Sequence, residues 1–162
     1  MDVRSDEEIR ADLAYLFDKA SQALAARMGA ALAELDISAR DYCVLSKAAA
    51  GGLTQSELAE RALLDKTTMV VTVDRLERAG LARRTPSPTD RRARIVETTA
   101  AGDETVAKAR SVIERLYDEV LGALPAEQRA TLLDALVRLV GQGGPLSAVE
   151  PVPNAPRRRR SA

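Results

Sequence analysis

Apolar residues recur at every third or fourth position along most of the chain, a spacing that lines one face of an amphipathic helix. The first stripe covers residues 9–35 and predicts a helix of about 30 residues, roughly 45 Å long. Ser5 and Glu8 stand at its start with the spacing of a capping box. A stripe of this length usually packs partly against a second chain, whereas a break near Gly29 would give two shorter helices instead. Its apolar positions are Ile9, Leu13, Leu16, Ala20, Leu24, Met28, Leu32 and Leu35.

Two short helical patterns follow each other closely between residues 54 and 80. Thr54 and Glu57 form a capping box that predicts the start of the first helix, and Asp65 is the expected N-cap of the second. The second helix has one apolar face, and its predicted buried residues are Met69, Val73, Leu76 and Gly80. The opposite face is expected to be exposed, with partial burial of a valine as the alternative; it carries Lys66, Thr67, Val70, Val71, Asp74 and Arg78.

An arginine-rich hairpin pattern comes directly after this pair of helices. Residues 81–85 have the pattern of extended chain, residues 86–90 contain two prolines and predict a turn, and residues 92–98 return as a strand. Leu53 predicts a very short strand that can pair with this ribbon, and two further helical patterns follow it. A supporting helix, a tight turn, a recognition helix and a ribbon form a winged helix-turn-helix in this order. The predicted fold class is therefore mainly α with a small β-wing.

The chain has equal numbers of basic and acidic residues, 24 of each, so its net charge is zero. The charge is uneven, however, because residues 75–94 contain seven arginines against only Glu77 and Asp90, a local net charge of +5. A compact basic patch on a neutral protein is typical of a DNA-binding protein that acts at specific sites. A solvated charged loop is the alternative, but the two helices beside the patch favour DNA binding.

The composition argues against several other classes of protein. The chain has no histidine and one cysteine, which excludes a histidine-based metal site, a histidine-dependent triad and a disulfide framework within one chain. No glycine-rich phosphate-binding motif occurs, so we expect no cofactor, no metal and no enzyme activity. No apolar run approaches the ~18 residues of a membrane span, and the acidic N-terminus is not a secretory signal. We therefore expect a cytoplasmic protein without a membrane partner.

Two motifs resemble those of the MarR family of bacterial winged-helix transcriptional regulators. The first, at residues 65–84, resembles the recognition helix of that family, and its matching residues are Asp65, Leu76, Glu77, Gly80 and Leu81. The second, at residues 88–102, resembles the wing signature, and its matching residues are Asp90, Arg92, Thr98, Thr99 and Gly102. The family has a Leu-Thr pair where this chain has Thr98-Thr99, and many members carry arginine or another polar residue at Val70-Val71. The order of helices also matches, so the resemblance covers about residues 5–142.

The resemblance implies a regulator, a repressor, that binds a palindromic operator as a homodimer and that a small aromatic ligand releases. A two-fold dimer binds half-sites about one DNA turn apart, roughly 10 bp. The implied division is an N-terminal dimerisation helix at 1–36, a winged helix-turn-helix DNA-binding domain at 37–101, and C-terminal dimerisation helices at 102–142. Residues 143–162 are expected to form a disordered basic tail.

The candidate DNA-binding residues divide by chemistry into three groups. Cations and amides at helix starts neutralise phosphates, and these candidates are Lys66, Arg75, Arg83, Arg84 and Arg94, with Gln55 and Ser56. Side chains at the front of the recognition helix read bases in the major groove, and these are Thr67, Thr68, Val70 and Val71. The valines can make only apolar contacts, for which the methyl group of thymine is the natural partner, so we expect thymine in the site. At the tip of the ribbon, Arg91 or Arg92 would enter the minor groove while Asp90 holds the shape of the ribbon.

Several alternatives remain open from the sequence. A helical dimer that binds protein but not DNA would show the same helical patterns. Cys43 is either an oxidant-sensing thiol or a small core residue. The residues Leu16, Met28, Tyr42 and Leu45 would line a ligand site or belong to the core. The tail at Arg157–Arg160 would follow the DNA backbone, bind an acidic partner, or only keep the chain soluble.

Overall fold

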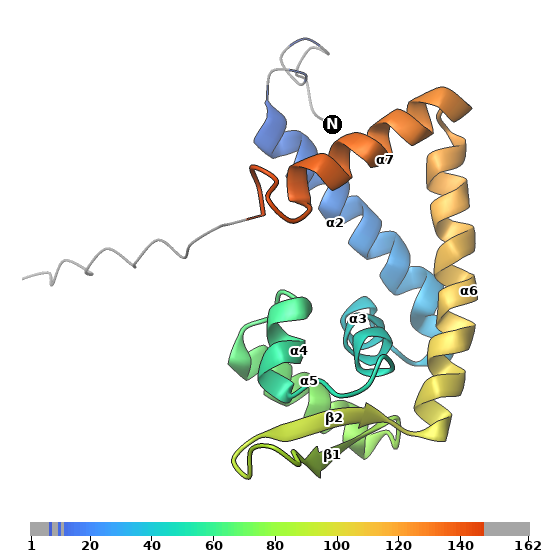
Figure 1. Cartoon of the computed structure of the whole chain (residues 1–162). Coiled ribbons are helices and arrows are strands. Elements are labelled where there is room, and N and C mark those ends of the chain that lie inside the picture. Colours follow the sequence, from blue (N-terminus) through green and yellow to red (C-terminus); the bar gives the residue numbers. More distant parts are fainter. Residues whose placement is uncertain (1–6, 8–9, 11, 148–162) are drawn as a thin grey trace, which may run out of the picture. The chain divides into compact units, whose positions relative to one another are not determined.

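The computed structural model describes Glu7, Arg10 and residues 12–147, and it confirms a mainly helical fold with one small antiparallel sheet (Figure 1). The capping box expected at Ser5 and the arginines of the tail lie outside the described residues. The chain divides into two compact units, one ending at Asp118 and the other beginning at Glu119. The described elements are α2 (Leu13–Leu32), η1 (Ala33–Leu35), α3 (Ala39–Ala48), α4 (Gln55–Arg61), α5 (Lys66–Arg78), β1 (Ala82–Pro86), β2 (Arg94–Thr98), α6 (Ala100–Gly122) and α7 (Ala126–Val140).

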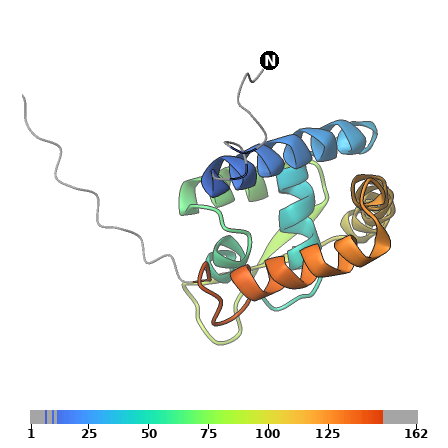
Figure 2. The same ribbon diagram turned by 90° about the horizontal axis from the view of Figure 1, so that it is seen from above.

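The helix α2 is shorter than the apolar stripe predicted. Its N-cap is Asp12, whose non-helical backbone (φ −101°, ψ 80°) lets the carboxylate accept a hydrogen bond from the amide of Tyr15 at 2.9 Å. The prediction of one helix of about 30 residues was therefore wrong, because α2 has 20 residues and begins at its own cap. Gly29 lies within α2, so the alternative break at that residue is wrong as well. Seen from above, α3 runs across α2, against which it packs (Figure 2).

Side-chain caps set the starts of the next three helices. Ser38 and Asp41 form a complete capping box at α3, and Thr54 and Glu57 form another at α4, as predicted for α4. Asp65 caps α5 by accepting a hydrogen bond from the amide of Thr68 at 2.9 Å. Each cap satisfies amides that the helix itself leaves without a partner, so the starting residues of these helices follow from local sequence.

One hydrophobic core holds α3, α4, α5 and the ribbon together. Met69, Val73 and Leu76 are buried, as the apolar face of α5 predicted. Gly80 was expected on the same face, but it is exposed. The reason is that α5 ends at Arg78 and Gly80 takes a left-handed conformation (φ +70°) beyond the C-cap, where glycine has no steric cost. Other members of this core are Val44, Leu45, Leu58, Val96 and Val106.

The two strands form an arm alongside α4 and α5 (Figure 1). β1 and β2 pair antiparallel, with Arg84 opposite Val96. An isolated bridge joins Thr54 to Ile95, and the amide of Val96 donates to the carbonyl of Leu53 at 3.1 Å, so the predicted short pairing segment is confirmed. The second strand was predicted to start at residue 92 but begins two residues later, since the turn at the tip is longer than expected.

The start of α6 is fixed against the turn that joins α5 to β1. The hydroxyl of Thr99 donates to the carbonyl of Gly80 at 2.6 Å and accepts from the amide of Gly102 at 3.1 Å. A Cβ at Gly102 would lie 2.0 Å from the carbonyl oxygen of Leu81, so this position admits only glycine without a shift of the backbone. The wing and α6 are therefore joined by a rigid connection.

The second unit contains the end of α6 and the helix α7. Pro125 is the N-cap of α7, next to the first-turn position where proline fits without loss of a hydrogen bond. None of the residues of α7 is buried, and its apolar side chains Leu132, Leu133, Val137 and Val140 are exposed. Among the described helices, none combines the length and hydropathy that crossing a lipid bilayer requires.

Candidate nucleic-acid interface

The exposed face of α5 carries the side chains that the sequence assigned to base reading. Lys66 and Thr67 are exposed, and Val70 and Val71 retain 41% and 59% of their accessible surface. Apolar side chains of this size are costly to leave in water, yet the core beneath α5 is filled by the opposite face. Partial burial of a valine was the alternative, but both side chains are exposed, so both can meet a ligand.

Thr68 differs from Thr67 because its hydroxyl is used inside the helix cap. It donates to the carboxylate of Asp65 at 2.6 Å, and this hydrogen bond is the main reason why the pKa of Asp65 lies below its ordinary value of 3.8. The oxygen of Thr68 can still accept a hydrogen bond, but its proton is already committed. Thr67 has no such bond among the described residues, which makes its hydroxyl the more available of the two.

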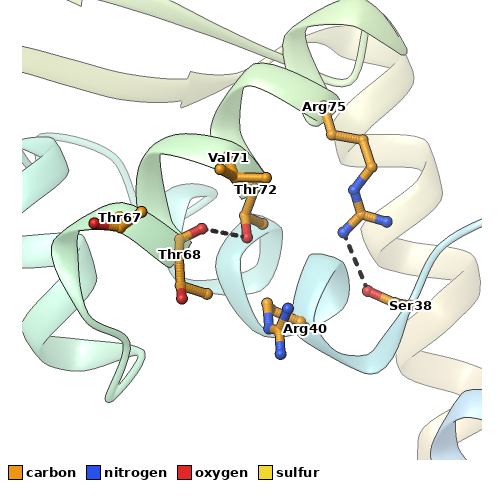
Figure 3. A pocket seen from close by; sticks show the side chains of 7 residues that line it. All are labelled: Ser38, Arg40, Thr67, Thr68, Val71, Thr72 and Arg75. Carbon is orange, nitrogen blue, oxygen red and sulfur yellow. Dashed lines mark hydrogen bonds between the residues drawn. The ribbon is translucent and has the colours of Figure 1, made fainter.

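A cleft of about 430 Å³ lies between the start of α3 and the face of α5 (Figure 3). Its lining combines two arginines with hydroxyl groups and one valine: Ser38, Arg40, Thr67, Thr68, Val71, Thr72 and Arg75. Arg40 was missed by the sequence reasoning. The cap at Ser38 does place Arg40 in the first turn of α3, but no local signal shows that this turn packs beside α5.

Arg75 is already engaged within the protein. Its guanidinium pairs with the carboxylate of Asp41, a side chain only 2% exposed, and donates to the hydroxyl of Ser38 at 3.3 Å (Figure 3). The pair joins α5 to the capping box of α3. Because the Asp41 carboxylate offsets its charge, Arg75 is a weaker candidate for a phosphate than the exposed Arg40.

The two arginines at the base of the ribbon also have acidic partners. Arg83 pairs with Glu97 on the opposite strand at 3.0 Å; Arg83 is exposed and Glu97 is half-buried. Arg84 contacts Asp74 at 2.7 Å, pairs with Glu77, and donates to the amide oxygen of Gln55 at 2.8 Å. The sequence placed both arginines on phosphates, but in this structure both are bound to protein groups.

The tip of the ribbon is organised differently. Asp90 accepts a hydrogen bond from the backbone amide of Arg92 at 2.8 Å, and the guanidinium of Arg94 donates to the carbonyl of Arg91 at 3.2 Å. Asp90 therefore shapes the turn through the backbone and not by pairing with the arginine side chain. Within the described part of the chain, the guanidinium groups of Arg91 and Arg92 have neither an ion pair nor a hydrogen bond, and both residues are exposed.

A groove of about 460 Å³ separates this tip from the start of α4. Its lining includes both residues that the sequence assigned to the α4 start and two arginines of the tip: Gln55, Ser56, Arg92 and Arg94. Glu57 also lines the groove, and the hydroxyl of Thr54 holds the pKa of its carboxyl below 4.5. The groove therefore has two arginines and Asp90 on the ribbon side, and hydroxyls, one amide and the Glu57 carboxylate on the α4 side.

The residues suggested as ligand liners separate into two sets. Leu45 is fully buried in the core, whereas Met28 and Tyr42 lie near Tyr117 of α6. The hydroxyl of Tyr117 is 3.9 Å from the sulfur of Met28, and burial, followed by the nearby Tyr42, raises the pKa of Tyr117 above 10.0. Tyr117 was missed by the sequence reasoning, which named no ligand-lining candidate in this helix.

Cys43 lies half-buried beside the core, with the ammonium nitrogen of Lys47 at 3.4 Å from its sulfur. Among the described residues, no group of histidine, cysteine, aspartate or glutamate side chains is arranged to hold a metal ion. The chemistry that the described residues bring together is therefore that of a binding surface: exposed cations, hydroxyls, amides and two valines.

Comparison with known proteins identifies the family of this chain. A family model described as MarR family matches residues 35–93, which span α3, α4, α5 and the tip of the ribbon. The transcriptional regulator HosA of Escherichia coli O111:H- is 30% identical over 106 residues, covering 65% of this chain and 78% of that protein.

Solved structures agree with the sequence matches. A mutant MarR from E. coli complexed with operator DNA is 26% identical, with a TM-score of 0.73 over 82% of this chain and 96% of that one. CouR from Rhodococcus jostii RHA1 bound to p-coumaroyl-CoA is 25% identical, with a TM-score of 0.71 over 80% of this chain and 92% of that one. The predicted winged helix-turn-helix fold is thereby confirmed. The matched proteins form a family of regulators and not of enzymes. The chain belongs to the MarR family of transcriptional regulators.

Proposed function

We propose that this protein is a bacterial transcriptional repressor that binds a palindromic operator as a homodimer. The observation that carries the proposal is the exposed face of α5, from Lys66 to Val71, in the same compact unit as the unpaired arginines of the wing tip. A helix in the major groove and a cationic tip in the minor groove are the two contacts of a winged-helix regulator. The MarR complex with operator DNA supports the same use of this fold.

The residues have distinct roles in this proposal. Thr67, Val70 and Val71 contact base edges, and the valines prefer the methyl group of thymine. Arg91 or Arg92 enters the minor groove. Phosphates are bound by Lys66, Arg40 and Arg94, with Gln55 and Ser56 at the start of α4. Thr68, Arg75, Arg83 and Arg84 are less suited to direct contacts, because each is already bonded within the protein.

The apolar side chains that a single chain leaves uncovered support the proposed homodimer. In α7, Val137 and Val140 are 67% and 57% exposed, and in α2 Leu13 is 62% exposed. Burying such side chains against a second copy removes apolar surface from water. Two-fold symmetry of the dimer then requires a palindromic site.

We further propose that a small aromatic ligand weakens DNA binding. CouR from Rhodococcus jostii RHA1 has been solved bound to p-coumaroyl-CoA, so one structural relative takes a ligand with an aromatic acyl group. In this chain, Met28, Tyr42 and Tyr117 offer a sulfur and two phenol rings at the meeting of α2, α3 and α6. Regulation of this kind takes place where the chromosome lies, in the bacterial cytoplasm.

The test is a footprint of the purified protein over the genome of its source, repeated with a panel of aromatic acids. We expect protected palindromes that overlap promoters, loss of transcript from those promoters in vitro, and release by one class of aromatic acid. A helical dimer that binds only protein would retard no duplex at any salt concentration, and this result would refute the proposal. If the protected sites instead lie upstream of promoters that the protein activates, the proposed role changes from repressor to activator.

A redox role of Cys43 is the second candidate, favoured only by the ammonium of Lys47 near its sulfur. Peroxide should then release DNA from the wild-type protein and not from Cys43→Ser. Equal release from both proteins would assign Cys43 to packing.

A further inference from the structure

Arg84 lies at the centre of a cluster that joins three elements of the DNA-binding unit. Its side chain is 21% exposed and donates to Gln55 of α4, Asp74 and Glu77 of α5, and, at 3.4 Å, to the carbonyl of Val70. We call Arg84, Gln55, Asp74 and Glu77 the Arg84 clamp. All four residues lie in the first compact unit, so the cluster is internal to it.

The charge of the Arg84 clamp does not suit a phosphate. One guanidinium faces the two carboxylates of Asp74 and Glu77, which leaves the cluster with a net charge of −1. A DNA phosphate that approached Arg84 would meet an occupied cation and two like charges. An arginine in such a setting contributes little counterion release, which is the source of affinity for phosphate-binding cations.

The Arg84 clamp also binds a backbone amide of the wing. Glu77 accepts a hydrogen bond from the backbone amide of Arg84 at 2.7 Å, in addition to its pairing with the guanidinium. Arg84 stands opposite Val96, whose amide donates to Leu53 and not to β1, so this pair of residues exchanges no ladder hydrogen bonds. Glu77 therefore attaches β1 to the recognition helix at both the main chain and the side chain of one residue.

Gln55 is oriented by the same contact. A guanidinium only donates hydrogen bonds, so the amide oxygen of Gln55 must face Arg84, at 2.8 Å from its Nε atom. The amide nitrogen of Gln55, with two donors, is then directed away from Arg84. Gln55 lines the groove between α4 and the wing tip, where a DNA phosphate would be bound.

We propose that Arg84 is a positioning residue that does not contact DNA. It fixes the wing and the start of α4 against α5, so that Arg92 reaches the minor groove while α5 occupies the major groove. This inference rests on the proposed DNA-binding function and deepens it. Rigid placement matters because a second contact made by a preorganised arm avoids the cost of ordering that arm on binding.

The experiment is a double-mutant cycle on DNA binding by the full chain. The probe is a duplex that wild-type protein selects from a pool with a randomised centre. Arg92→Ala and Lys66→Ala are each measured in wild-type protein and in Arg84→Gln. Lys66 is the matched control because it starts α5 and does not belong to the wing. Circular dichroism and a melting curve verify that each variant is folded.

If Arg84 positions the wing, Arg92→Ala weakens binding about tenfold in wild-type protein but less than about twofold in Arg84→Gln. Lys66→Ala then weakens DNA binding by the same factor in wild-type protein and in Arg84→Gln. Arg84→Gln alone weakens binding about tenfold and lowers the slope of log K against log salt, because Arg92 no longer reaches DNA, and adding Arg92→Ala then lowers the slope no further. If Arg84 binds a phosphate instead, each of the two substitutions lowers that slope by about 0.9 per subunit and the costs of Arg84 and Arg92 add, which would overturn the proposal.

Glu77→Ala provides a second test if Arg84→Gln does not fold. This variant removes a negative charge beside DNA, so a purely electrostatic role predicts tighter binding. The positioning role predicts weaker binding and a reduced cost of Arg92→Ala. Tighter binding with an unchanged cost of Arg92→Ala refutes the inference. If wild-type protein selects no duplex at all, the proposed function itself has failed, and this outcome is distinct from additivity in the cycle.

Discussion

The ribbon contains two arginine doublets, and the structure treats them in opposite ways. At the base, Arg83 pairs with Glu97 and Arg84 is held by carboxylates of α5. At the tip, the guanidinium groups of Arg91 and Arg92 have no partner among the described residues. At the base, Arg84 therefore fastens the wing to α4 and α5 and Arg83 pairs across the ribbon, whereas the same dipeptide at the tip leaves two charges available. Local positive charge alone does not identify the residues that meet DNA.

Loss of a tip arginine should have the largest effect on DNA binding. Arg92→Ala removes an unpaired cation, so we expect the dissociation constant to rise about tenfold or more and the salt slope to fall by about 0.9 per subunit. Titration of a fixed duplex at several salt concentrations measures both. The matched control at the base is Arg83→Ala, which removes an arginine already offset by Glu97 and should cost less. If Arg92→Ala and Arg83→Ala change the affinity and the salt slope equally, the tip and base arginines do not differ in their contribution to DNA binding.

The second prediction concerns the shape of the tip. The carboxylate of Asp90 accepts from the amide of Arg92, and this local hydrogen bond closes the turn. Asp90→Ala should weaken DNA binding about threefold to tenfold, because the turn loses its acceptor. Asp90→Asn keeps an acceptor and removes a negative charge, so it should bind at least as tightly as wild-type protein. If Asp90→Asn and Asp90→Ala weaken DNA binding equally, Asp90 acts through its charge and not through the turn.

These two doublets show what the sequence could predict and what it could not. The starts of α4 and α5 were predicted because each cap joins residues three positions apart, as Asp65 and Thr68 are. The wing was predicted from its turn residues and its spacing after α5. The partners of the base doublet were not, since Arg84 and Gln55 are 29 positions apart and Arg83 and Glu97 are 14 apart. Such pairs depend on tertiary packing, which apolar periodicity does not report.

The error at α2 has a related cause. The apolar stripe continues on both sides of Asp12, so periodicity predicted one helix across it. Asp12 nevertheless forms a cap, which competes with continuation of a helix because its side chain satisfies the amide of Tyr15. Periodicity identifies the face of a helix more reliably than its ends.

A smaller effect should follow when the base doublet is freed. Glu97→Gln removes the carboxylate that faces Arg83, in a pair whose side chains are 65% and 37% exposed. Exposed pairs of this kind are worth about 0.2–1 kcal/mol, so the fold should remain stable. Arg83 then becomes available to DNA, and we expect binding about twofold tighter with a slightly steeper salt slope. Unchanged affinity would mean that Arg83 lies beyond the reach of the backbone.

The smallest change in total affinity is expected from the apolar part of the interface, which separates reading of bases from attraction by charge. Val71 is 59% exposed on α5 and carries no charge. Val71→Ala should change affinity by less than about twofold and leave the salt slope unchanged. It should, however, relax the preference for thymine at one or two positions, because contact with the methyl group is lost.

Binding profiles over a randomised duplex, compared between wild-type protein and Val71→Ala, measure this preference directly. Thr67→Ala is the matched variant, since Thr67 is exposed on the same helix and offers a hydroxyl in place of methyl groups. Loss of this hydroxyl should alter the base preference at a different position of the DNA site. Identical profiles for wild-type protein and Val71→Ala would show that this valine meets no base. The specificity of the site would then depend on Thr67 and on the shape of the DNA that the tip arginines read.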